Sequence, residues 1–165
     1  MSLGLTEGFC GSSVAHREDI RAYLEGLTVE GMVIDWGSGS KPVMKYVNGD
    51  KAMFHTIDIN PQVNPDTLAD IQSNTFNTFL KADHAFCMEV LEHTTNPQMV
   101  LHNIHHNLRE GGRLHLSVPF LYPEHGENDY LRFTRQGLRY YAEEAGFKNI
   151  WIWDITDGFL MEATA

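Results

Sequence analysis

A glycine-rich turn directly after a short apolar run is the feature that most constrains the fold. Residues 33–40 read Val-Ile-Asp-Trp-Gly-Ser-Gly-Ser, so the run ends in Asp35 and continues into Gly37 and Gly39. Such a run is typical of a buried parallel strand, and glycines let the backbone turn sharply and approach a ligand closely. A second apolar run ends in Asp58, nineteen residues after Gly39, where a carboxylate suits a ribose diol. The pattern therefore predicts a cofactor that contains a nucleoside.

Length and charge narrow the possible classes of protein. The chain has 165 residues, which predicts one domain over residues 1–165 with a helical lead-in at 1–30. A net charge of −10 disfavours nucleic acid and anionic membranes as partners. The two cysteines are far apart, and no apolar stretch approaches the roughly 20 residues that span a membrane. We therefore expect a cytoplasmic protein with no nucleic-acid or membrane partner.

Apolar runs alternate with amphipathic helical segments along most of the chain. This alternation predicts an α/β fold, a Rossmann-like three-layer sandwich whose mainly parallel seven-stranded sheet ends in an antiparallel hairpin strand. The expected helices lie near 13–27, from Pro42, over 97–110 before Gly111-Gly112, and from Thr134 to Gly146; the expected strands lie near 32–35, 52–58, 70–71, 85–88, 113–118, 149–155 and 159–161.

The C-terminal segment carries a strong turn signal. Asp157-Gly158 is typical of a two-residue hairpin turn, which would fold residues 159–161 back as an antiparallel edge strand. An exposed edge strand can pair with another chain, so a homodimer is a possible assembly.

The glycine pattern separates the candidate cofactors. A dinucleotide fingerprint needs a third glycine at the position of Pro42, and the Gly-Lys-Ser/Thr ending of a phosphate-binding loop is absent. S-adenosylmethionine has no phosphate; it needs a close backbone approach, an acid for the ribose and a polar group for adenine. Asp35 with the two glycines, Asp58 and Asp70 supply these groups in chain order at the ends of the first three strands.

Five blocks in this order resemble class I S-adenosylmethionine-dependent methyltransferases over residues 33–147. They are Val-Ile-Asp-Trp-Gly-Ser-Gly at 33–39, Ile-Asp-Ile-Asn at 57–60, Ala-Asp-Ile at 69–71, Glu-Val-Leu-Glu-His at 89–93 and Leu-Arg-Glu-Gly-Gly-Arg-Leu at 108–114. The segments at 117–126 and 130–134 are similar to a subset of type-11 methyltransferases. The resemblance implies S-adenosylmethionine as cofactor and methyl transfer as activity.

The residues and the resemblance together predict two sets of site residues. Asp35 would meet the amino group of the cofactor, Asp58 its ribose and Asp70 its adenine, while Met88 and Glu89 would lie beside its methionine part. The full cofactor set is Asp35, Gly37, Ser38, Gly39, Asp58, Ile59, Asp70, Ile71, Met88 and Glu89. The catalytic candidates are His93, His125 and Tyr122, with His125 as a possible general base.

Two further groups of residues have competing interpretations. Arg132 could grip an anionic acceptor, or it could pair with Glu127 or Asp129. The histidines at 102, 105 and 106 have a spacing reminiscent of a metal site, but they face away from the apolar side of their helix, so we expect no metal there.

Three functions remain open at this point. The first is methyl transfer to a small-molecule or sugar-like acceptor; the absence of an Asn/Asp-Pro-Pro-Tyr/Phe block disfavours amide or base N-methylation. The second is a non-catalytic S-adenosylmethionine-binding module, a sensor or a subunit, because little chain is left over for a substrate lid. The third, an NAD-dependent dehydrogenase, is disfavoured by Pro42.

Overall fold

A computed structural model describes residues 10–40, 43–76, 78, 80–126 and 128–165. In chain order these residues form α1 (Cys10–Glu25), β1 (Thr28–Trp36), β2 (Asn48–Asp58), β3 (Thr67–Leu68), β4 (Ala82–Met88), α2 (Pro97–Asn107), β5 (Leu108–Pro119), α3 (Arg135–Glu144), β6 (Lys148–Ile155) and β7 (Gly158–Thr164). Within these residues no helix has the length and apolar character needed to cross a membrane. The helix expected from Pro42 begins outside the described residues; Val43–Lys45 form a single 3-10 turn.

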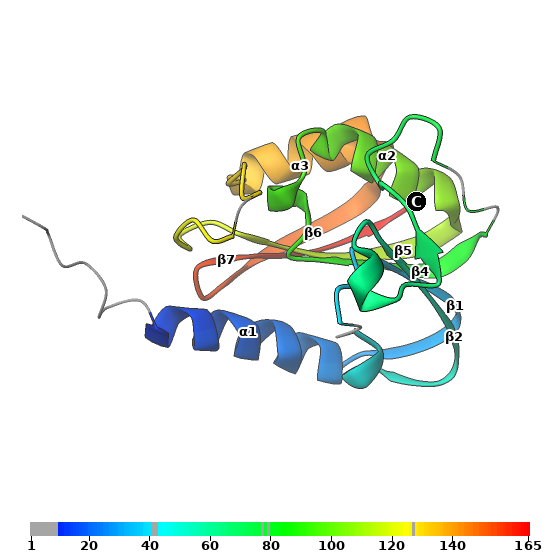
Figure 1. The fold of residues 1–165 in the computed structure, drawn as a ribbon, viewed down its shortest axis with the longest axis horizontal. Coiled ribbons are helices and arrows are strands. Elements are labelled where there is room, and N and C mark those ends of the chain that lie inside the picture. The colour runs from blue at the N-terminus through cyan, green and yellow to red at the C-terminus, as the bar shows by residue number, and fades with distance from the viewer. Residues whose placement is uncertain (1–9, 41–42, 77, 79, 127) are drawn as a thin grey trace, which may run out of the picture.

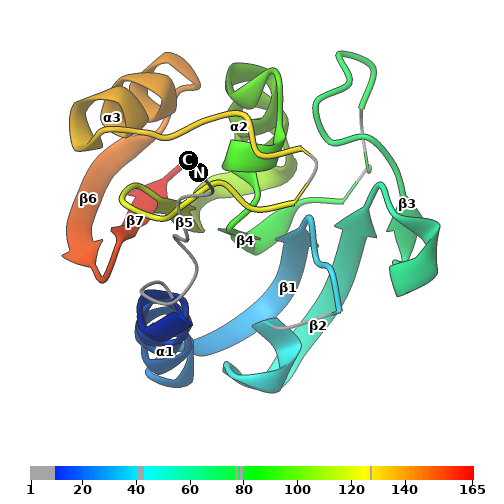
Figure 2. The same ribbon diagram turned by 60° about the vertical axis from the view of Figure 1, so that its left-hand side comes forward.

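The seven strands form one sheet in the order β3-β2-β1-β4-β5-β7-β6 (Figures 1 and 2). β1 pairs in parallel with β2 on one side and with β4 on the other, so the strand order reverses beside β1. Loops that leave the carboxyl ends of two such strands go to opposite faces and open a crevice between them. The expected mainly parallel sheet with an antiparallel C-terminal strand is confirmed.

Helices cover both faces of the sheet, as a three-layer sandwich requires. α1 lies on one face, while α2 and α3 lie side by side on the other (Figures 1 and 2). Ile20 and Leu24 of α1 pack in a core with Val33 and Phe86. The second core contains Leu101 of α2 and other fully buried side chains beneath the two helices. Each such side chain stabilises the fold by roughly 1.5–3 kcal/mol through burial.

The end of α2 differs from the expectation. The helix stops at Asn107, because Leu108 already has the extended backbone of β5, and Gly111-Gly112 lie within that strand. A Cβ at Gly112 would lie 2.9 Å from the carbonyl oxygen of Arg109 and 3.1 Å from that of Ala82. Gly112 therefore permits a close approach between strands, and neither glycine ends the helix.

The last strand does not lie at the edge of the sheet, where the sequence predicts it. β7 lies between β5 and β6 and pairs antiparallel with both, so it is not an edge strand. The turn consists of Thr156 and Asp157, one residue earlier than expected, because Ile155 already pairs with Gly158. The edge is β6, on which Trp151 is 70% exposed. The apolar character of residues 159–161 reflects burial between two strands. The argument for a homodimer through β7 therefore does not hold, and a homodimer itself stays a prediction.

One buried amide fixes the segment that follows β3, which is only two residues long. Asn103 of α2 donates from Nδ2 to the carbonyl oxygens of Ile71 (2.8 Å) and Ser73 (2.9 Å). Buried carbonyl groups need such partners, since an unpaired one costs about 1–3 kcal/mol. Asn103 thus holds in place a segment that the β-ladder alone would leave loose.

We expect Asn103→Ala to lower the free energy of unfolding by about 2 kcal/mol, because two carbonyl groups lose their partner. Urea unfolding followed by circular dichroism measures this loss. His102→Ala, on the exposed side of the same helix, is the matched control and should change stability by less than about 0.5 kcal/mol. Equal effects of the two substitutions would contradict the assigned role of the amide.

Candidate functional site

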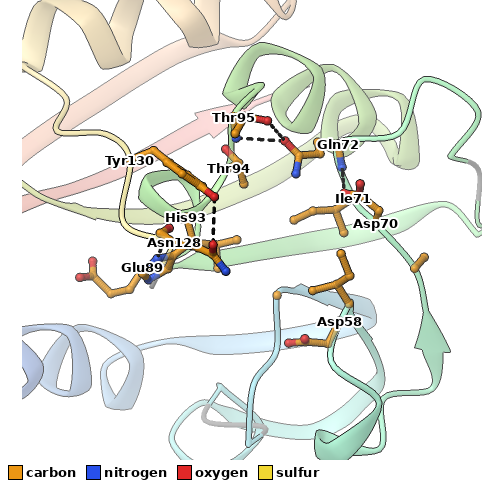
Figure 3. A pocket seen from close by; sticks show the side chains of 14 residues that line it. Asp58, Asp70, Ile71, Gln72, Glu89, His93, Thr94, Thr95, Asn128 and Tyr130 are labelled. Atoms are coloured by element: carbon orange, nitrogen blue, oxygen red, sulfur yellow. Dashed lines mark hydrogen bonds between the residues drawn. The ribbon is translucent and has the colours of Figure 1, made fainter. Parts of the chain in front are cut away.

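A cavity of about 340 Å³ opens at the carboxyl ends of β1, β2 and β4, at the point where the strand order reverses. Its volume lies within the range of small-molecule sites. Carboxylates from three strand ends line it, those of Asp58, Asp70 and Glu89. Figure 3 shows Asp58 and Asp70 toward one end of the cavity and Glu89 and His93 toward the other.

The glycine turn is held against the end of β2. The amides of Gly37 and Ser38 both donate to the carbonyl oxygen of Ile57, at 2.8 and 3.1 Å. Gly37 has a φ of 71°, and a Cβ there would lie 2.7 Å from the side chain of Val90. Only glycine fits this backbone and this contact, so the turn presents bare backbone to the cavity.

Asp58 is oriented by two backbone amides. Its Oδ2 accepts from Gly39 at 2.8 Å and its Oδ1 from Asn60 at 2.8 Å. Each oxygen keeps a further lone pair for a ligand hydroxyl. The acid and the glycine turn, nineteen residues apart in sequence, thus form one rigid unit.

Asp35 is buried at the end of β1, with only 2% of its surface exposed. Among the described residues its Oδ2 has no hydrogen-bond partner, nor has the buried hydroxyl of Ser38. Burial, and secondarily the charge of Asp58, raises the pKa of Asp35 to about 7. A buried carboxyl group with an unused oxygen favours a cationic or hydrogen-donating ligand nearby.

The end of the cavity that Asp70 lines is apolar on two sides. Ile59, 65% exposed, follows β2, and Ile71 follows β3, and both line the cavity. Asp70 lies beside Ile71, with its Oδ1 accepting from the amide of Gln72 at 3.0 Å. Two aliphatic side chains and a carboxylate suit the faces and the edge of a purine ring.

Gln72 was not among the predicted site residues. Its Oε1 accepts from the amides of Thr95 (3.0 Å) and Asn96 (3.1 Å) and thereby joins the segment after β3 to the start of α2. Asn128 and Tyr130, also absent from the predicted set, line the cavity from the loop after β5, with the Tyr130 hydroxyl donating to Asn128 at 2.9 Å. No local pattern marks these residues, because their positions depend on tertiary contacts.

Met88 and Glu89 end β4 but face different spaces. Met88 lines a second cavity, of about 540 Å³, between α1 and the sheet, and does not line the first. Glu89 lines both cavities and has a φ of 55°, which is strained for a residue with a side chain. Such strain, of order 1–3 kcal/mol, is concentrated at functional sites. Glu89 therefore marks the junction of the two spaces.

The three catalytic candidates form a chain of ring contacts beside this junction. The rings of His93 and His125 lie 5.0 Å apart, and those of His125 and Tyr122 lie 5.2 Å apart, both edge to face. Of the three, His93 lines the first cavity. The structure thus brings the candidates together, with His93 nearest the predicted cofactor position.

Arg132 adopts the second of its two expected roles. Both terminal nitrogens of its guanidinium bind the carboxylate of Asp129, and its other donors reach backbone carbonyl oxygens. This pairing holds the pKa of Asp129 well below its usual range, chiefly through the hydrogen bonds from Arg132. The pair braces the loop after β5 and leaves Arg132 committed within the protein.

Among the described residues, the histidines at 102, 105 and 106 of α2 do not belong to a group of side chains that could hold a metal ion. His102 and His106 are exposed, whereas His105 is half-buried with its ring edge to face with Phe147 at 5.0 Å. The expectation that all three lie on the solvated face is therefore wrong for His105, whose ring fills space beside Gly146.

Comparison with known protein families identifies the chain. A family described as a methyltransferase domain matches residues 15–152. The chain belongs to this methyltransferase domain family. The match covers the glycine turn, the acidic strand ends and the loop after β5, and it confirms the resemblance to class I enzymes. No curated protein matches the chain.

Solved structures with the same fold include several methyltransferases. A chain from the complex between the Haloferax volcanii Trm112 methyltransferase activator and a putative methyltransferase is 18% identical, with a TM-score of 0.74, over 94% of this chain and 91% of the other. A SAM-dependent methyltransferase from Aquifex aeolicus is 15% identical, with a TM-score of 0.66, over 89% and 88%. At this level of identity the likeness shows the fold of this methyltransferase domain.

We expect Asp35→Asn to raise the stability of the ligand-free domain above pH 7. The carboxyl group has a pKa of about 7 in the folded state against 3.8 in the unfolded state, so its ionisation opposes folding between these values. The gain from the neutral amide should therefore grow from pH 4 to pH 7, by at most about 1.4 kcal/mol per pH unit, and then level off. Chemical unfolding at several pH values measures it.

Asp50→Asn, at the exposed start of β2, removes one carboxylate without touching the cavity and serves as the control. The difference in stability between Asp50→Asn and the original chain should not grow from pH 4 to pH 7. A stability difference for Asp35→Asn that does not change with pH would refute the assignment of Asp35 as a buried carboxyl group with a raised pKa.

Proposed function

We propose that this chain binds S-adenosylmethionine and transfers its methyl group to a small-molecule or sugar-like acceptor. The observation that carries the proposal is one cavity, at the reversal of strand order, that combines the bare backbone of Gly37 with the carboxylates of Asp58 and Asp70. Membership of the methyltransferase domain family supports it. So does a structure of the same fold, a Haemonchus contortus phosphoethanolamine N-methyltransferase solved with S-adenosylmethionine (TM-score 0.68, 10% identity, over 88% of this chain and 52% of the other).

The residues present fit the cofactor group by group. Asp58, already oriented by two amides, would accept from the ribose hydroxyls. Ile59 and Ile71 would enclose the adenine, with Asp70 at its amino edge. The unpartnered oxygen of Asp35 would meet the ammonium group of the methionine part, directly or through water.

When bound, the cofactor supplies a methyl carbon already activated by the sulfonium. The chain itself then has to align the acceptor and exclude water. Glu89 lines both cavities, so the acceptor would have room beside it in the second cavity. His93 and His125 would take a proton from an acceptor hydroxyl. Since no buried dyad of base and nucleophile is required, the compact site is sufficient for this reaction.

The alternative is a module that binds the cofactor without catalysis. The observation that favours it is the limited cover over the catalytic candidates, which within the described residues comes from the loop after β5. Both functions require cofactor binding, but only the first produces a methylated product. A panel of hydroxyl- and amine-bearing small molecules and sugars, assayed for S-adenosylhomocysteine release, distinguishes the two.

We expect Asp58→Ala to weaken S-adenosylmethionine binding by roughly 10- to 100-fold, since the ribose loses charge-assisted hydrogen bonds worth about 1.5–3 kcal/mol. Calorimetric titration with S-adenosylmethionine and S-adenosylhomocysteine measures this, with NADH as a ligand that should not bind. Asp50→Ala is the matched control for charge and should bind like the original chain.

Because the carboxylate also holds Gly39, thermal unfolding of both variants must accompany the titrations. Retained folding with lost binding supports the ribose contact. Unchanged affinity of the folded Asp58→Ala variant, or no binding of either adenosyl ligand by the original chain, would refute the proposed function.

A further inference from the structure

Three ligand-type side chains converge beside the cofactor cavity, although two segments far apart in sequence supply them. Glu92 and His93 lie in the 3-10 turn Leu91–His93 after β4, and His125 lies in the loop after β5. One carboxylate oxygen and one nitrogen from each ring all lie within 4.8 Å of one another. No metal was expected from the sequence, because only folding brings these groups together.

The carboxylate of Glu92 is the least satisfied group in this cluster. Its side chain is 0% exposed, and within the described residues neither of its oxygens has a hydrogen-bond partner. Nε2 of the neighbouring His93 lies 3.7 Å from Glu92 Oε1, which is too far for a hydrogen bond. The charges of Glu89 and Asp129 and the opposite charge of Arg132 also act on this carboxyl group. A buried carboxyl group without a hydrogen bond is costly, and a bound cation would offset that cost.

The tautomer of His93 is defined by its backbone contact. Its Nδ1 lies 2.9 Å from the carbonyl oxygen of Asn128, which can only accept, so Nδ1 carries the proton. In the neutral ring Nε2 then presents a lone pair toward Glu92. Histidines that bind metals commonly donate their other nitrogen to a backbone carbonyl in this way.

His125 is held in place by a carboxylate. Its Nδ1 lies 3.0 Å from Asp129 Oδ2, an ion-pair distance without the geometry of a hydrogen bond, and Oδ2 accepts from the backbone amide of His125 at 2.9 Å. Arg132 fixes Asp129 through a two-pronged ion pair. A carboxylate behind an imidazole is typical of the outer shell of metal sites, because it sets the orientation of the ring.

We propose that Glu92, His93 and His125 bind a divalent transition-metal ion. Two imidazoles and one carboxylate suit Zn²⁺, Fe²⁺, Mn²⁺ or Co²⁺ better than Mg²⁺ or Ca²⁺, which prefer oxygen ligands alone. Three protein ligands leave coordination positions open, and His93 lines the cofactor cavity. An acceptor hydroxyl bound at an open position would lose its proton more readily, to water that reaches the cavity, while His93 and His125 hold the ion instead of acting as bases; this role rests on the proposed function, whereas binding of the ion does not.

The test uses the full chain after treatment with a chelator that is then removed. Titration with Co²⁺, followed by its visible absorption, and with Zn²⁺, followed by calorimetry, should show one ion bound at micromolar or lower concentration. His93→Ala and His125→Ala should each weaken binding at least tenfold. His102→Ala and His106→Ala, on the exposed face of α2, are matched controls and should leave it unchanged.

Glu92→Gln adds a readout that a merely structural role would not produce. The stabilisation by added Zn²⁺ should be smaller in this variant than in the original chain, because the neutral amide is a weaker metal ligand than the carboxylate. The proposal is overturned if the original chain binds no ion, or if both His93→Ala and His125→Ala bind as tightly as it does.

Titrating S-adenosylmethionine into the chelator-treated chain separates the two proposals. Cofactor binding there, with no metal binding in the other experiment, leaves methyl transfer standing and removes the ion. Metal binding without cofactor binding leaves the metal site standing and removes the proposed methyl transfer.

Discussion

The parallel pairing of β1 with both β2 and β4 is the constraint on which the rest of the structure depends. Val33, Ile34 and Asp35 stand in register with Phe54, His55 and Thr56 on one side and with His84, Ala85 and Phe86 on the other. A strand hydrogen-bonded on both edges and fully buried at its end cannot shift its register without exposing the core. The glycine turn, the acid of β2 and the strained Glu89 therefore always meet at one edge of the sheet.

Local patterns were enough to predict the part of the site that lies directly after strands. Gly37, Asp58 and Asp70 follow apolar runs, and carboxyl ends of parallel strands necessarily converge. Local patterns failed where a partner elsewhere in the chain decides the outcome. Gly112 was read as a helix end, yet the neighbouring carbonyl of Ala82 explains it. The last apolar run was predicted to be an edge strand, yet β5 pairs with its other edge. Neither the role of Gln72 nor the proximity of Glu92 to His125 had a local signal.

Buried acids give the cavity edge a consistent electrostatic character. Asp35 has a pKa raised to about 7, and burial together with the charge of Glu89 raises the pKa of Glu92 well above its usual range. Both carry oxygens that no described residue satisfies. Protonation lowers the cost of these groups in the ligand-free domain, and a bound cation would offset the cost of their ionised forms. The proposed cofactor, with its ammonium group and sulfonium, and the proposed divalent ion would supply such cations at two separate points.

The loop after β5 couples these two points mechanically. The amides of Tyr130 and Leu131 donate to the carbonyl oxygen of Glu92 at 2.8 and 3.2 Å, and the carbonyl of Asn128 fixes His93. The same loop carries His125 and its Asp129–Arg132 brace. Any movement that opens the loop would therefore separate His125 from Glu92 and free the ring of His93. If the proposed ion binds, the loop after β5 would both complete its site and cover the acceptor side, so that ordering and covering would become one event.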